Sequence, residues 1–336
     1  MSNKLLCIAI PTYRRLHHLK RVLDSLCDEV QGLEDVIEIF VSDNHSCDGT
    51  AEYLQALSIK FKFLSFISNP ENLGPDENFR LCFVNSNAKY FWLLGDDDFP
   101  KKGFLSELIY FINNKKNIDI IYLNSHWVVD IDLAMHSRVD DLSYKLMTKY
   151  SFAEYVNIWL GYISAVIIKK DLIEFSDQEL LQQLKGSNLI QLGWVLPALK
   201  KGKNFFVINT KCILATRNNT GGYAAIDIFG VRLPRILKSY LAEDVLLQRK
   251  VLEPMILSFF TALVWKIRNQ SDEGVFLNNH NWENVKQNLN NIWAFRLLTK
   301  PAYSLPKNWG IFFVLLAKII GYLRKKTLLW IGYEFI

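Results

Sequence analysis

The chain has 336 residues, of which 50% are hydrophobic and 13% aromatic, and its formal net charge is +5. This composition excludes a largely disordered chain and is long enough to bury the core of one large domain or two. The five cysteines are odd in number and scattered without CxxC spacing, so we expect reduced thiols in the cytosol.

The first 125 residues alternate between expected strands and helices. Leu16, Leu19, Val22, Leu23 and Leu26 recur at helical spacing, which predicts an amphipathic helix. Further helices are expected over residues 50–57, 77–85 and 104–113. Short apolar runs predict strands over residues 5–10, 36–41, 61–67, 90–94 and 118–123. Strands and helices that alternate in this way indicate an α/β fold, a mostly parallel sheet with helices on both faces.

The pattern is weaker after residue 124. We expect a strand over residues 162–169, a helix over residues 186–200 and a strand over residues 204–208. From residue 233 onward the sequence predicts helices only. The expected division is therefore an α/β domain over residues 1–230 and a helical region over residues 231–336.

Three carboxylates follow a buried strand. Residues 90–94 are apolar, Gly95 ends the strand, and Asp96, Asp97 and Asp98 come next without a basic residue before Lys101. Three like charges repel one another, and a divalent cation would relieve that repulsion. Mg²⁺ and Mn²⁺ prefer carboxylate oxygens and are often shared with substrate phosphates. The cluster therefore predicts an enzyme that acts on a phosphate-containing substrate.

Two other polar loops also follow strands, at residues 11–15 and 42–49. Ligands of parallel α/β folds bind beyond the carboxyl ends of the strands. The three loops are thus expected to converge on one site. Neither GxGxxG nor GxxxxGK[ST] occurs in the sequence, which leaves dinucleotide and P-loop sites without support.

The net charge is concentrated at the C-terminal end. Residues 300–336 hold six cations and one anion, which equals the whole net charge of +5. The longest uncharged runs there are too short for a spanning helix. The segment over residues 309–329, flanked by Trp309 and Trp330, instead suggests a helix that lies on an anionic membrane surface, rather than nucleic-acid binding. A helix docked on the protein's own core is the alternative.

Four motifs together resemble family 2 glycosyltransferases, which have the GT-A (Rossmann-like) fold. They are Ile8-Ala-Ile-Pro-Thr-Tyr-Arg-Arg15, Val41-Ser-Asp-Asn-His-Ser-Cys-Asp-Gly-Thr50, Asn69-Pro-Glu-Asn-Leu-Gly74 and Trp92-Leu-Leu-Gly-Asp-Asp-Asp98. Within the family, the sequence from Asn72 to Asn78 is similar to that of bacterial O-antigen enzymes of the abequosyltransferase type.

The resemblance implies roles for individual residues. Donor binding falls to Pro11, Thr12, Tyr13, Arg15, Asp43, Asn72, Gly74, Asp96 and Asp97. Asp96 and Asp98 match an Asp-x-Asp motif that would ligate Mg²⁺ or Mn²⁺ on the donor diphosphate. Asp43 would accept a hydrogen bond from the base, and an Asx-turn or helix cap is its alternative role. The resemblance also divides the α/β domain into a donor half, residues 1–125, and an acceptor half, residues 126–230.

The residues at the position of the family's catalytic base differ from the family pattern. Family 2 enzymes generally invert the anomeric centre and use an Asp in a Glu-Asp pair as general base. In this sequence Ser187 and Asn188 stand at the corresponding positions. Asp177 is the nearby carboxylate that we would test first as the base, although it and its acidic neighbours could equally be solvated helix charges.

The sequence thus predicts a glycosyltransferase of the hexosyltransferase type. By resemblance it would take a hexose or deoxyhexose from a CDP-, UDP-, GDP- or dTDP-linked donor. The acceptor would be a polyprenyl-linked oligosaccharide of the O-antigen pathway at the cytoplasmic face of the bacterial inner membrane, where the enzyme would be peripheral. A capsule enzyme with the same donor site, or a catalytically inactive membrane-bound scaffold of the same fold, are the alternatives.

Overall fold

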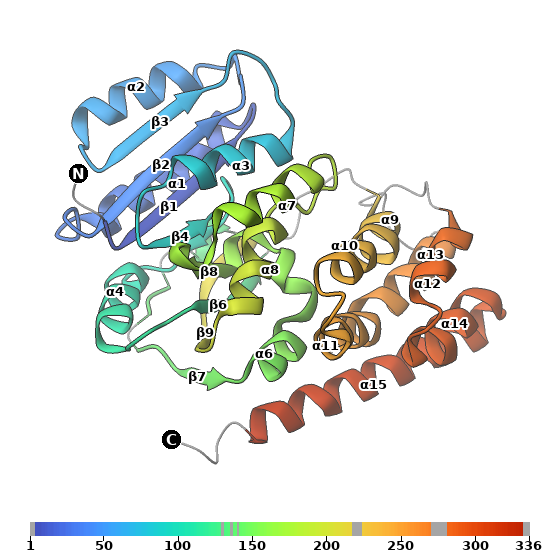
Figure 1. Cartoon of the computed structure of the whole chain (residues 1–336). Coiled ribbons are helices and arrows are strands. Elements are labelled where there is room, and N and C mark those ends of the chain that lie inside the picture. The colour runs from blue at the N-terminus through green and yellow to red at the C-terminus, as the bar shows by residue number, and fades with distance from the viewer. Residues whose placement is uncertain are drawn as a thin grey trace. The chain divides into compact units, whose positions relative to one another are not determined.

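The computed structural model describes residues 4–128, 131–134, 137–139, 141–216, 224–269 and 281–331 (Figure 1). The chain forms two compact units. Unit 1 consists of Met1–Met147 and Leu160–Asn218, and unit 2 of Thr148–Trp159 and Asn219–Ile336. The short segment Thr148–Trp159 thus belongs to the unit that contains the C-terminal helices.

Unit 1 is an α/β unit, as predicted. Its strands are β1 (Leu6–Thr12), β2 (Ile37–Asp43), β3 (Leu64–Ser68), β4 (Tyr90–Leu93), β5 (Phe99–Pro100), β6 (Ile120–Val128), β7 (Tyr144–Met147), β8 (Val166–Lys169) and β9 (Phe205–Thr216). Its α-helices are α1 (Leu16–Val30), α2 (Thr50–Lys60), α3 (Pro75–Asn85), α4 (Phe104–Asn114), α5 (Ile131–Ala134), α7 (Gln178–Gln183) and α8 (Leu192–Lys201). Four 3-10 turns lie around β8, namely η1 (Asn157–Gly161), η2 (Ile163–Ala165), η3 (Lys170–Leu172) and η4 (Phe175–Asp177).

The sheet is mixed, with the order β3-β2-β1-β4-β8-β6-β9-β5 and β7 paired to β9. Strands β1 to β4 are parallel to one another, and β6 is parallel to β9. Strand β8 is antiparallel to both of its neighbours, β4 and β6. It follows that β6 runs in the same direction as β4 and that β8 begins at the edge where β4 and β6 end.

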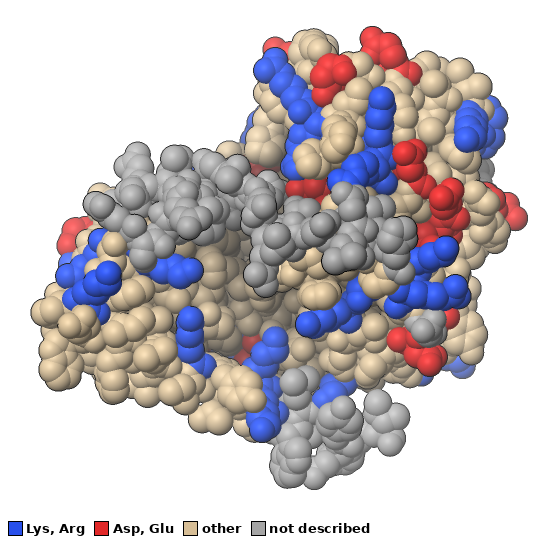
Figure 2. Space-filling model, turned by 180° about the vertical axis from the view of Figure 1, so that it is seen from behind, with Lys and Arg blue, Asp and Glu red and all other residues tan. Residues whose placement is uncertain are grey.

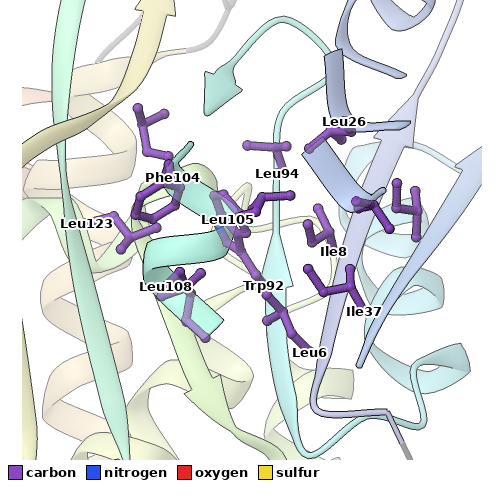
Figure 3. Close-up of a cluster of buried hydrophobic side chains, with 14 of the residues drawn as sticks. Leu6, Ile8, Leu26, Ile37, Trp92, Leu94, Phe104, Leu105, Leu108 and Leu123 are labelled. Carbon is purple, nitrogen blue, oxygen red and sulfur yellow. The ribbon is translucent and has the colours of Figure 1, made fainter. Parts of the chain in front are cut away.

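Successive side chains of a strand point to opposite faces of the sheet, and apolar side chains pack on both faces. Figure 3 shows Leu6, Ile8 and Trp92 of the strands beside Leu105 of α4, within one continuous apolar cluster. On the opposite face the ring of Phe91 meets the rings of Phe83 and Trp194 edge-on, at centroid distances of 5.2 and 5.6 Å.

The weakly patterned region departs from the expectations. The strand expected over residues 162–169 is only β8, because residues 163–165 form the 3-10 turn η2. The helix expected over residues 186–200 begins only at Leu192. Gly186 and Asn188, with φ of 81° and 60°, are in the left-handed region, which a right-handed helix cannot contain. The strand expected over residues 204–208 extends to Thr216.

Unit 2 is helical, as predicted. Its helices are α6 (Lys149–Val156), α9 (Ala225–Asp227), α10 (Leu233–Tyr240), α11 (Val245–Met255), α12 (Thr261–Arg268), α13 (Trp282–Leu289), α14 (Lys300–Ser304) and α15 (Lys307–Ile331). Three π-helical turns join them, η5 (Ile228–Arg232), η6 (Ile256–Phe260) and η7 (Phe295–Thr299). None of the helices in the described part of the chain combines the length and the apolar character needed to cross a bilayer.

A buried carboxylate fastens α15 to the rest of unit 2. Glu154 of α6 is 6% exposed and accepts hydrogen bonds from Lys250 of α11 and from Arg324 of α15, whose Nη2 lies 2.7 Å from Oε1. Arg324 also pairs with Glu253 at 3.0 Å. The long helix is therefore held by two ion pairs as well as by apolar contacts.

Replacing Glu154 by Ala is expected to lower the free energy of unfolding of unit 2 by roughly 2 to 3 kcal/mol, because the two cations lose their buried partner. Limited proteolysis of the full chain should then cut near α15 faster than in the wild type. Glu283→Ala is the matched control, because Glu283 forms an exposed pair with Lys286 at 2.7 Å and such pairs contribute little. Equal protection of both variants would contradict this role of Glu154.

Candidate active site

The site lies where parallel strands end. Thr12 is the last residue of β1 and pairs in register with Asp43, the last residue of β2. Strand β4 lies on the other side of β1 and leads through Leu94 and Gly95 into the acidic cluster Asp96–Asp98. The three polar loops that were expected to converge therefore begin at the same edge of the sheet.

The three carboxylates are buried, and two of them pair with Arg15. Asp96, Asp97 and Asp98 are each only 5 to 6% exposed. Arg15 lies 3.1 Å from Oδ1 of Asp96 and 2.5 Å from Oδ2 of Asp97. The hydroxyl of Thr12 donates to Oδ2 of Asp96 at 2.8 Å. The first strand and its following loop thus bind the cluster directly.

Burial changes the acidity of two of these groups. It raises the pKa of Asp96 to about 7, an effect that the charge of Arg15 opposes and the neighbouring carboxylates reinforce. It raises the pKa of Asp98 to about 6, with Asp97 acting in the same direction. The main physical cause is that burial removes water from these carboxyl groups and so disfavours their charged forms.

Two residues of the site were missed by the sequence analysis. The phenol of Tyr162 donates to Oδ2 of Asp98 at 2.7 Å, and the hydroxyl of Ser164 donates to the same oxygen. Ser164 also accepts from the backbone N–H of Gly95 at 2.9 Å, and its carbonyl accepts from the indole of Trp92. These contacts depend on the turn η2 entering at the carboxyl edge, which no local sequence pattern marks.

The second polar loop is held by amide side chains. Asn44 donates to Oδ1 of Asn72 at 2.8 Å, and this oxygen also accepts from the N–H of Gly74 at 3.0 Å. Asn78 accepts from the hydroxyl of Ser42 at 2.7 Å, so it fixes the end of β2 from the helix α3. The predicted residues Asn72 and Gly74 therefore lie in one network beside β2.

The carboxylate of Asp43 is 2% exposed and accepts from the N–H of Ser46 at 3.1 Å. This bond reaches the third residue along the chain, whereas an Asx-turn reaches the second, and the role of Asp43 in donor binding stays a prediction. The helix α2 is capped separately, because Asp48 accepts from the N–H of Thr50 at 3.2 Å. Pro11 is buried in β1 beside Ser42, and the ring of Tyr13, in the same loop as Arg15, lies 5.1 Å from the guanidinium carbon of Arg14.

Asp177 is engaged in a structural ion pair. Its Oδ2 lies 2.6 Å from Nζ of Lys201 and accepts from the N–H of Glu174 at 2.8 Å. At the positions of the family's Glu-Asp pair, the N–H of Asn188 donates to Asp76 of α3 at 3.0 Å. Burial raises the pKa of Asp76. The assignment of Asp177 as the base stays a prediction, and its burial is already explained by these contacts.

The donor set of the acidic cluster fits a divalent cation. Three buried carboxylates lie together beside Arg15, and hard oxygen ligands of this kind suit Mg²⁺ or Mn²⁺. Within the described ranges, no group of three or more His, Cys, Asp or Glu side chains is already arranged around a common metal position. Asp96 and Asp98 as metal ligands therefore remain a prediction.

Comparison with known proteins gives the family. The family model described as Glycosyl transferase family 2 matches residues 7–174, half of the chain. The abequosyltransferase RfbV of Salmonella typhimurium is 31% identical over 188 residues, 51% of this chain and 55% of that protein. The uncharacterized glycosyltransferase MJ1057 of Methanocaldococcus jannaschii is 24% identical over 163 residues, 47% of this chain and 54% of that protein. The chain spans about half the length of the curated relatives it matches.

Solved structures agree on the fold. Residues 1–349 of TarS from S. aureus match with a TM-score of 0.57 at 14% identity, over 94% of this chain and 90% of that one. The mannosyltransferase PcManGT from Pyrobaculum calidifontis, solved with GDP-Man and Mn²⁺, matches with a TM-score of 0.51 at 13% identity, over 96% and 87% of the two chains. With its GT-A fold and its family match, the chain belongs to glycosyl transferase family 2.

Proposed function

We propose that this glycosyltransferase moves a hexose or deoxyhexose from a nucleoside-diphosphate donor to a lipid-linked oligosaccharide during O-antigen assembly. The observation that carries the transfer chemistry is the buried cluster of Asp96, Asp97 and Asp98 at the carboxyl ends of β1 and β4. The pathway is inferred from the similarity to an abequosyltransferase. A capsule enzyme with the same donor site is the alternative, and the acceptor would distinguish the two.

We propose that Asp96 and Asp98 hold Mg²⁺ or Mn²⁺. When bound, the cation would neutralise charge that develops on the leaving nucleoside diphosphate. Thr12 and Arg15 fix the orientation of Asp96, while Tyr162 and Ser164 fix that of Asp98. The base and ribose would lie beside β1 and β2, next to Pro11, Tyr13 and Asp43. The loop that contains Asn72 and Gly74 would lie beside the donor.

We propose an inverting transfer, in which a carboxylate removes the proton from the acceptor hydroxyl as the new glycosidic bond forms and the diphosphate leaves. Asp177 is the candidate base. Lys201 holds its carboxylate at 2.6 Å, so the pair would have to separate before Asp177 could accept a proton.

We propose that α15 docks the enzyme on an anionic membrane surface. One face of the helix is buried against unit 2, with Val314 and Ala317 at most 3% exposed. The other face carries a row of large exposed side chains, which we call the apolar stripe: Trp309, Phe312, Leu315, Ile319, Tyr322 and Leu323. These residues are spaced three or four apart or adjacent, so they share one side of the helix.

The cations of α15 divide into two groups. Arg324 is occupied by Glu154 and Glu253, so it stabilises the fold rather than the membrane contact. Lys318 and Lys326 are exposed next to the apolar stripe, where they could meet lipid phosphates. Figure 2 shows Lys and Arg side chains at several places on the face opposite that of Figure 1. The side chain of Trp330, expected to flank the segment, lies outside the described residues.

Transfer should depend on the acidic cluster. Asp96→Ala or Asp98→Ala is expected to lower the rate of sugar release from the active nucleotide sugar by about 100-fold or more, as loss of a main electrostatic contact does. A screen of CDP-, UDP-, GDP- and dTDP-linked sugars with Mn²⁺ measures this. Asp171→Ala, at a carboxylate that is 71% exposed in unit 1, is the control that should keep full activity. Full activity in either cluster variant would exclude that residue as a required ligand.

The titration of Asp96 and Asp98 should contribute a loss of stability to the metal-free protein as the pH rises from about 4 to 7. The raised pKa values mean that these two groups bind more protons in the folded protein than in the unfolded chain in this range. Asp96→Asn should therefore raise the free energy of unfolding at pH 8 by up to about 4 kcal/mol and leave it unchanged at pH 4. Mn²⁺ should stabilise the wild type more at pH 8 than at pH 5. Thermal denaturation measures these changes, and a melting temperature of Asp96→Asn equal to that of the wild type at pH 8 would contradict a costly buried charge at Asp96.

Membrane binding should depend on the apolar stripe. The double change Phe312→Ser and Ile319→Ser is expected to reduce sedimentation with vesicles of phosphatidylglycerol and phosphatidylethanolamine at least fivefold, because both side chains are more than half exposed and inserted area is lost. Leu297→Ser, 61% exposed in unit 2 but outside the stripe, is the control. Sedimentation equal to that of the wild type would refute the docking role of α15.

A further inference from the structure

Trp127 of β6 is an exposed tryptophan near the acidic cluster. It is 38% exposed, although the first four residues of β6 are buried. Its ring stacks on the ring of Tyr162 at a centroid distance of 5.6 Å and an interplanar angle of 29°. A partly exposed indole that stacks on a second ring presents a flat apolar surface, which a ligand can contact.

The pair is joined to the acidic cluster by one hydrogen bond. The hydroxyl of Tyr162 donates to Oδ2 of Asp98 at 2.7 Å. This bond fixes the ring on which Trp127 stacks to the acidic cluster. Gln191, 6% exposed, donates to the carbonyl of Gly161 at 2.5 Å and fixes the backbone just before Tyr162. The two rings therefore form a surface of fixed orientation rather than a loose loop.

The sheet order decides which ligand this surface serves. Strands β1 and β2, which carry Thr12 and Asp43, lie on one side of β4, whereas β8 and β6 lie on the other. Because β6 runs in the direction of β4, Trp127 lies toward the carboxyl edge, where the acidic cluster also lies. In the proposed function the nucleotide lies on the β1–β2 side and the diphosphate lies at the acidic cluster. The β6 side then remains for the acceptor, the molecule that receives the sugar.

We propose that Trp127, stacked on Tyr162, is the platform on which a sugar ring of the acceptor lies. The apolar C–H face of a pyranose packs on an aromatic ring, while its hydroxyls remain free for polar partners. A platform beside Asp98 would hold the acceptor hydroxyl close to the anomeric carbon and so supply the orientation that transfer needs. This inference rests on the proposed function, because it names the acceptor subsite of that reaction.

The test separates acceptor binding from donor chemistry. Wild type, Trp127→Ala and Trp127→Phe are compared for hydrolysis of the active nucleotide sugar in water and for transfer to octyl glycosides of mannose, galactose, glucose and rhamnose. Trp127→Ala should raise the acceptor KM at least tenfold and leave donor hydrolysis within twofold, and Trp127→Phe should restore most of the affinity. Tyr110→Ala, at an aromatic residue of α4 that is 68% exposed, is the matched control.

An unchanged acceptor KM in Trp127→Ala would overturn the proposal, and so would an equal loss of donor hydrolysis, which would place the donor on this ring. A fluorescence titration with the same glycosides gives a readout that needs no turnover. Quenching in the wild type that disappears in Trp127→Phe supports the platform, and absence of quenching in the wild type refutes it. If no nucleotide sugar is consumed, the proposed function fails while this titration still decides on the platform.

Discussion

The structure of the site depends on the burial of three carboxylates beside the guanidinium of Arg15. Burial raises the pKa of Asp96 and Asp98, because it disfavours their charged forms, and the neighbouring carboxylates act in the same direction. The hydrogen bonds from Thr12 and Ser164 oppose this effect without removing it. Buried carboxylates of this kind are suited to a ligand that brings positive charge.

The fold explains why such a site is possible. Four parallel strands bring the loops after Thr12, Asp43 and Leu93 to one edge of the sheet. The apolar faces of the sheet, seen in Figure 3 around Trp92, are packed against helices and keep the backbone rigid beneath the polar edge. Rigid strands thus hold carboxylates at positions that their mutual repulsion would otherwise disfavour.

Much of the fold could be predicted from the sequence. The apolar runs of β1, β2 and β4 and the periodic leucines of α1 are local signals, and the family motifs lie on the loops between them. The parts that could not be predicted are those decided by distant contacts. Tyr162 and Ser164 precede a strand of only four residues, and only the pairing of β8 with β4 shows that they reach Asp98. The late start of α8 likewise depends on the left-handed backbone of Asn188, which no side-chain period reveals.

The reversed direction of β8 has a consequence for how such an enzyme can diversify. Since β8 starts at the edge where β4 ends, the residues just before it reach Asp98 from the side of β4 opposite to β1. Strand β6 pairs with β8 and has to stay in place, but the loops that join α4, β6 and β7 take no part in this contact. Those loops can therefore change in length during evolution while the hydroxyls of Tyr162 and Ser164 keep their positions.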